Sequence, residues 1–140
     1  MSLKKLILAM VVCYIVLMGT NYVIHNIWLM NDYLAVADTW RPMSDMMHKI
    51  WVMWIGQAFF AVLFCYIYVR GVEMKPWAAQ GIRYGILITL FAVIPSALGE
   101  YTVYNVPHIL AIKWMIGGGI QMIILGLIVA GICQKGSAKT

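Results

Sequence analysis

The sequence predicts an all-α integral membrane protein, organised as an antiparallel bundle of four transmembrane helices with both termini cytoplasmic. The composition leads to this fold class. Hydrophobic residues make up 64% of the 140 residues, charged residues make up 11%, and the mean hydropathy is +0.86. A soluble domain has about 45–50% apolar and about 25% charged residues. The composition therefore excludes a water-soluble globule, a disordered chain and a disulfide-stapled secreted domain.

Four apolar stretches are each long enough to cross a bilayer. A helix needs about 20 mostly apolar residues for this, because every backbone polar group in the hydrocarbon must be bonded within the helix. The predicted spans are 3–30, 45–69, 81–104 and 108–133. They occupy most of the chain and contain no internal repeat, so we expect residues 1–140 to form a single membrane domain.

Loop-forming residues separate the four stretches. Residues 31–44 and 70–80 contain the charged residues, glycines and prolines that interrupt the apolar pattern. The third connection is the short segment Asn105-Val106-Pro107. Asn105 is suited to cap a helix, and Pro107 is suited to the first turn of the fourth helix. Short connections favour antiparallel neighbours.

The orientation is predicted from lysine and arginine, which are retained on the cytoplasmic side of a membrane. If the N-terminus is inside, seven of these residues fall on the inner side and three on the outer side. The inner residues are Lys4, Lys5, Arg70, Lys75, Arg83, Lys135 and Lys139, and the outer ones are Arg41, Lys49 and Lys113. Size and layout favour a bacterial-type inner (plasma) membrane. Topology and anionic lipid account for the net charge of +5, so nucleic acid is not an expected partner.

The cysteines are predicted to be small buried hydrophobic residues. Cys13, Cys65 and Cys133 all fall away from the outer connections and far from one another in the sequence. This spacing argues against an outer-face thiol oxidase and against a thiolate zinc site. Unpaired cysteine commonly packs as a small apolar side chain.

Small residues within the spans predict close helix contacts. Gly117-Gly118-Gly119 is expected to interrupt the fourth helix near its middle, and Gly126 extends the run of small residues toward the inner side. Pro95 is expected to kink the third helix, because proline removes one backbone hydrogen bond.

Polar residues within the spans are concentrated in the outer half, where a functional site is expected. Glu100 and Lys113 lie at similar depth on the two helices joined by the last connection, since each is a few residues from it. We expect these two side chains to form a buried ion pair. The pair would either fix the register of the helices or provide a proton or ion site.

The histidines and methionines give three further hypotheses: copper, haem and quinol binding. A Met-x-x-Met spacing next to a histidine suits Cu(I), which prefers soft thioether and imidazole ligands. The candidate metal ligands are Met43, Met46, Met47, His48 and His25. Two histidines on facing helices can instead hold a b-type haem. The candidate residues for a haem or a quinol are His25, His48, His108 and Glu100.

The sequence contains no catalytic constellation, so a non-enzymatic role is favoured. The leading interpretation is a small polytopic inner-membrane protein that acts as an accessory or assembly component of a larger membrane complex. It would contact the lipid bilayer and either a membrane-protein partner or a second copy of itself. One alternative is a membrane protein that binds copper, haem or a quinol at the outer-face cluster. Another is a small transporter that uses Glu100 and Lys113.

Overall fold

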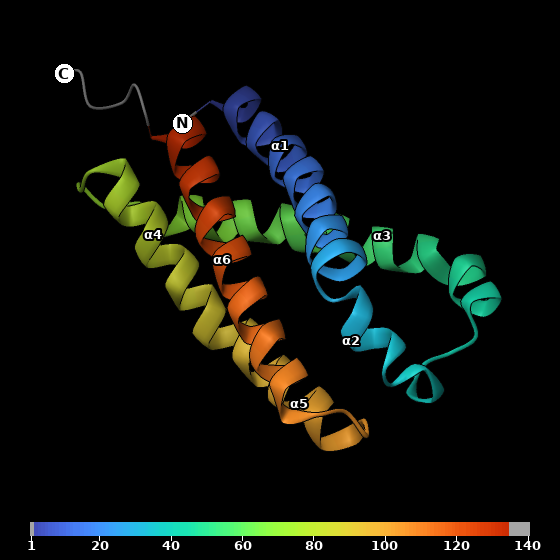
Figure 1. Ribbon diagram of the computed structural model, residues 1–140. Coiled ribbons are helices and arrows are strands. Elements are labelled where there is room, and N and C mark those ends of the chain that lie inside the picture. Colours follow the sequence, from blue (N-terminus) through green and yellow to red (C-terminus); the bar gives the residue numbers. More distant parts are fainter. Residues whose placement is uncertain (1, 135–140) are drawn as a thin grey trace.

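The computed structural model describes residues 2–134, which are helical over most of their length and contain no strand (Figure 1). Four helical segments are long and apolar enough to cross a membrane, namely Leu3–Trp28, Met43–Arg70, Trp77–Val103 and His108–Cys133. The prediction of an all-helical protein with four candidate spans is confirmed. Lys135 and Lys139, which contributed to the predicted orientation, lie outside the described residues.

The four segments are built from the following elements. In chain order they are α1 (Leu3–Tyr22), the π-helical segment η1 (Val23–Trp28), α2 (Met30–Leu34), the 3-10 turn η2 (Ala37–Thr39), α3 (Met43–Arg70), α4 (Trp77–Ile88), the π-helical segment η3 (Thr89–Val93), α5 (Ile94–Val103) and α6 (His108–Cys133). The third span begins at Trp77, four residues before the predicted start at Gly81. The first connection contains a helix, α2, that the sequence did not predict.

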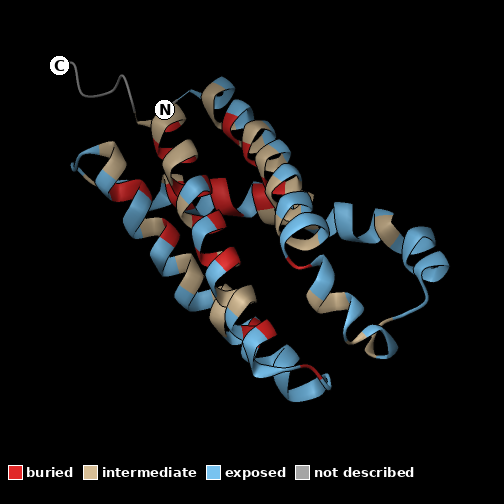
Figure 2. Cartoon of the chain, viewed as in Figure 1, coloured by how far each residue is buried: buried red, intermediate tan, exposed pale blue. Residues whose placement is uncertain are grey.

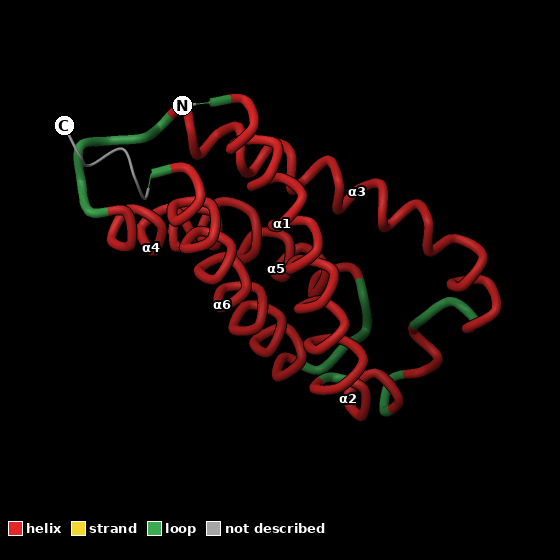
Figure 3. Tube along the Cα trace, turned by 90° about the horizontal axis from the view of Figure 1, so that it is seen from above, coloured by secondary structure: helices red, strands yellow, loops and turns green. Residues whose placement is uncertain are grey.

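Helix α6 lies between α1 and α4, and the chain runs along it in the opposite direction to both (Figure 1). Helix α3 instead crosses the others at a steep angle. Its buried residues, Ala61, Phe64, Cys65 and Tyr68, all belong to its C-terminal half. The N-terminal half is exposed and stands apart from α1 and α6, as Figures 2 and 3 show. Only half of α3 therefore packs into the helical core.

Glycines set the closest helix contact in the molecule, between α4 and α6. A Cβ atom at Gly81 would lie 2.6 Å from the carbonyl oxygen of Gly126. A Cβ atom at Gly85 would lie 2.6 Å from Cα of Ile123. The two backbones are in contact, so no side chain larger than hydrogen fits between them.

The glycine triplet packs against both π-helical segments. A Cβ at Gly117 would lie 3.1–3.2 Å from Trp28 and Ile24 of η1, and one at Gly118 would lie 2.6 Å from Val93 of η3. Helix α6 is continuous through the triplet, in contrast to the predicted interruption. The irregularity occurs instead in η3, just before Pro95, where the missing proline N–H frees a carbonyl of the preceding turn.

The three cysteines are buried and unpaired, which confirms the sequence interpretation. They belong to the main hydrophobic cluster, in which Cys13 of α1, Cys65 of α3 and Cys133 of α6 pack with Leu125 and Val129. This cluster holds together the ends of the helices opposite the α5–α6 connection.

A polar network ties the α3–α4 loop to the end of α6. Gln80 donates to the carbonyl of Gly71 at 2.9 Å, Gln134 donates to Gln80 at 2.9 Å, and Tyr68 donates to Gln134 at 2.7 Å. Glu73 in the same loop forms ion pairs with Arg83 and Lys75. Hydrogen bonds from Arg83 and then Lys75 lower the pKa of Glu73 to about 2.

The Glu73 ion pairs are expected to make stability depend on pH. The folded-state pKa lies below the ordinary value of 4.5, so the stabilisation is present above that value and is lost as the pH falls toward about 2. We expect the Tm of the wild type in mild detergent to fall more steeply below about pH 5 than that of Glu73→Gln. Parallel falls in the two proteins would contradict this assignment.

Candidate functional site

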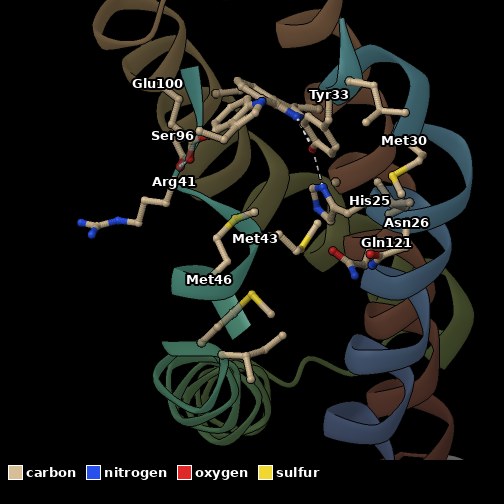
Figure 4. A pocket seen from close by; sticks show the side chains of 18 of the residues that line it. His25, Asn26, Met30, Tyr33, Arg41, Met43, Met46, Ser96, Glu100 and Gln121 are labelled. Atoms are coloured by element: carbon tan, nitrogen blue, oxygen red, sulfur yellow. Dashed lines mark hydrogen bonds between the residues drawn. The ribbon is translucent and has the colours of Figure 1, made fainter. Parts of the chain in front are cut away.

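The splayed half of α3 leaves a cleft of about 1200 Å³ between it and the remaining helices (Figure 4). Its walls come from η1, α2, α3, η3, α5 and α6. Most of the lining is apolar. The polar or titratable residues in the walls include His25, Asn26, Tyr33, Asp38, Arg41, Ser96, Glu100, Trp114 and Gln121. The cleft therefore combines a large apolar surface with a small number of hydrogen-bonding groups.

A chain of hydrogen bonds joins three of the cleft residues. The indole Nε1–H of Trp114 donates to the hydroxyl of Tyr33 at 2.8 Å. The Tyr33 hydroxyl lies 2.6 Å from Nδ1 of His25, and the two rings stack at 5.9 Å. Burial raises the pKa of Tyr33, so this hydroxyl keeps its proton at neutral pH. The chain holds the His25 imidazole in the cleft wall.

Lys113 pairs with Asp32 of α2, not with Glu100. Its Nζ lies 2.8 Å from both carboxylate oxygens of Asp32, and the two side chains are only 29% and 23% exposed. The prediction of a Glu100–Lys113 ion pair is therefore wrong. The short helix α2 returns over the N-terminal end of α6 and brings a nearer carboxylate to the lysine, which the depth along the third and fourth spans did not reveal.

Glu100 is exposed and lines the cleft from α5. Its carboxylate accepts a hydrogen bond from Ser96 at 3.2 Å, one helical turn away. On another wall Gln121 is 6% exposed and donates to Thr20 and Asn21 of α1 at 2.6 and 2.9 Å. Figure 4 shows Gln121 close to His25, and Glu100 with Ser96 on a different wall of the cleft.

The structure brings together some of the other predicted site residues. Met43, Met46 and Met47 line the cleft together with His25, and Figure 4 shows the Met43 and Met46 side chains directed into it. His48 is exposed on α3 and is not among the lining residues. His108 is exposed at the start of α6 and is also outside the cleft.

The positions of these residues affect the haem, copper and quinol hypotheses differently. Only one of the three histidines lines the cleft, so the described residues do not offer it two axial imidazoles for a haem. Within residues 2–134, no group of three or more His, Cys, Asp or Glu side chains is arranged to hold a metal ion. The copper hypothesis rests mainly on methionines, and Met43, Met46, Met47 and His25 line the same cleft, so it stays a prediction. A quinol requires only hydrogen bonds and an apolar surface.

Several cleft residues were missed by the sequence interpretation. Tyr33 and Trp40 belong to residues 31–44, which were expected only to connect two spans, and so does Asp32, the partner of Lys113. The sequence signal that was available is the amphipathic cluster Asn31-Asp32-Tyr33, directly after the first span. Its place in the site depends on α2 folding back over α6, as the contact between Tyr33 and Trp114 shows.

The fold and the cleft define a helical protein with four candidate membrane spans and an amphipathic cleft beside the N-terminal half of α3. No known protein family, characterised protein or solved structure matches the chain.

Proposed function

We propose that the protein binds a lipid-soluble small molecule, with the quinol–quinone couple as the leading class, in the cleft beside α3. The observation that carries the proposal is the cleft itself. Its volume of about 1200 Å³ is somewhat above the range of about 300–1,000 Å³ for small-molecule sites, and its lining is mostly apolar with a few polar groups, as is typical of such sites. The apolar part of the ligand would contact the methionines of α3, and its polar end would lie near His25.

The location of the exposed lining residues supports entry from the bilayer. Met43 and Met46 on α3 are exposed, as are Ser96 and Glu100 on α5. The cleft is therefore open along the side between α3 and α5, two segments that are both candidate membrane spans. We further propose that both termini are cytoplasmic and that the membrane is of the bacterial inner type. The lysine and arginine distribution supports this orientation, in which the cleft lies in the outer half of the bilayer.

The test is native mass spectrometry of the protein extracted in mild detergent from its own membranes. We expect the wild type to carry a retained small molecule. Ala92→Trp should lose it, because Ala92 lines the cleft and a larger side chain would occupy part of its volume. Ala79→Trp is the matched control, since Ala79 is exposed on α4 and outside the cleft. Identical spectra for the wild type and Ala92→Trp would contradict the proposal.

A second candidate is the accessory role in a larger membrane complex. The observation that favours it is the exposed half of α3, where Met47, Trp51 and Trp54 are 59%, 57% and 44% exposed. A helix of a partner could pack on this face. Stoichiometric partner subunits in the same spectrum, reduced by Trp51→Ala and unaffected by Ala92→Trp, would favour this candidate over the first.

A further inference from the structure

We propose that the polar end of the cleft ligand is an uncharged carbonyl group that accepts a hydrogen bond from Nε2–H of His25. The inference rests on the proposed function and names the chemistry of its ligand. A quinone and a lipid with an ester linkage are two membrane molecules that carry a carbonyl on an apolar tail.

The direction of each hydrogen bond follows from the Trp114–Tyr33–His25 chain. An indole N–H only donates, so the Tyr33 oxygen is the acceptor of the 2.8 Å bond from Trp114. The Tyr33 hydroxyl also has one O–H donor, for which an acceptor must be found. Nδ1 of His25, at 2.6 Å, is the only acceptor for it among the described residues. We infer that Tyr33 donates to Nδ1, because the opposite direction would leave the Tyr33 proton without an acceptor among the described residues.

This direction fixes the tautomer of His25. In a neutral imidazole one nitrogen accepts and the other carries the proton, so an accepting Nδ1 leaves the proton on Nε2. Within residues 2–134, Nε2 of His25 has no hydrogen-bond partner. The ring lines the cleft and stands in its wall (Figure 4). The site therefore presents an unused hydrogen-bond donor.

Trp40 is a second donor without a partner at the same end of the cleft. Its indole Nε1–H is enclosed and makes no hydrogen bond. Its ring lines the cleft and packs edge-on against Tyr33, with the centroids 5.5 Å apart. Both donors belong to rings that pack on Tyr33, and an unmade hydrogen bond of an enclosed polar group is costly.

The charges near His25 do not favour an anionic acceptor. Lys113 is neutralised by Asp32 at 2.8 Å. Arg41 shares Asp45 with Lys49, but its side chain is 67% exposed and extends away from His25 (Figure 4). Glu100 adds a carboxylate to the cleft wall. A carboxylate or phosphate beside His25 would lose hydration without gaining a cation there, whereas a carbonyl needs only the donors.

The tautomer can be measured without any ligand. We expect ¹⁵N NMR of histidine-labelled protein at neutral pH to show His25 protonated at Nε2 and unprotonated at Nδ1. The signals are assigned with His48→Gln and His108→Gln, which alter exposed residues outside the cleft. Tyr33→Phe should abolish the single-tautomer pattern. A proton on Nδ1 in the wild type would overturn the inference.

Binding is measured with 2-decyl-1,4-benzoquinone by quenching of tryptophan fluorescence, in nanodiscs made of ether-linked phospholipid. His25→Phe should weaken binding about three- to tenfold, which is the effect of one neutral hydrogen bond. His25→Gln should stay close to the wild type, because the glutamine amide places an N–H near the position of Nε2. Decylbenzene, which has the same tail and no carbonyl, should compete poorly.

The outcomes separate this inference from the proposed function. If decylbenzene competes as well as the quinone and His25→Phe binds normally, the inference is overturned while the cleft remains a ligand site. If Ala92→Trp leaves quinone binding unchanged, or binding is not saturable in the wild type, both fail. Weaker quinone binding in ester-linked than in ether-linked lipid identifies the lipid ester as a competing source of the carbonyl. Equal binding identifies a quinone-type ligand.

Discussion

Gly126→Ala is expected to destabilise the protein by at least about 3 kcal/mol, because the new Cβ would overlap the backbone of α4. The atom it meets is the carbonyl oxygen of Gly81, which belongs to a helix and cannot rotate away. The helices must separate to admit the methyl group, and that separation removes the packing of α4 on α6. A large fall in Tm in mild detergent should report it.

The matched control is the same substitution at Gly99 of α5. A Cβ at Gly99 meets no atom within 4 Å, and alanine is the better helix former by about 1 kcal/mol. Gly99→Ala should therefore leave Tm unchanged or raise it slightly. If the two variants behave alike, the close approach of α4 and α6 is not a determinant of stability.

Asp32→Ala should have the second largest effect on stability, because it leaves the partly buried Lys113 ammonium without its partner. The pair is less than one third exposed, so we expect a coupling energy between the two side chains of about 1–3 kcal/mol. The coupling is obtained from a double-mutant cycle of Asp32→Ala and Lys113→Ala, with unfolding followed in mild detergent.

A second cycle, of Glu100→Ala and Lys113→Ala, is the control. Glu100 contacts Ser96 and Lys113 contacts Asp32, so these two substitutions should be additive within about 0.5 kcal/mol. Coupling in the Glu100 cycle together with additivity in the Asp32 cycle would reinstate the pair expected from the sequence and contradict the structure.

The number and extent of the helical segments could be predicted from the sequence, because hydropathy over about 20 residues reports the cost of exposing backbone to lipid. The last span, His108–Cys133, has the predicted bounds. The path of α3 could not be predicted in this way. Both halves of α3 are apolar, and lipid and protein offer a similar environment to an apolar side chain, so hydropathy does not distinguish the packed half from the splayed half.

The level of a residue along its helix could be predicted from the sequence, whereas rotation about the helix axis could not. Counting residues from the last connection placed Glu100 and Lys113 at one level, but it did not show which neighbour each side chain faces. The contacts are determined by α2, a five-residue helix that places Asp32 beside Lys113 and Tyr33 beside Trp114. Contacts between residues 81 positions apart leave no periodic trace in a single sequence.

The open side of the cleft between α3 and α5 determines how an affinity for this protein should be expressed. A ligand that enters from the bilayer is sampled at its mole fraction among the lipids. Adding lipid at constant protein and ligand dilutes that ligand, so the total concentration needed for half-saturation rises in proportion to the lipid present. At equilibrium the ligand has the same chemical potential in water and in lipid, so this proportionality follows from its partitioning, and an affinity for this protein is best expressed as a mole fraction in the lipid.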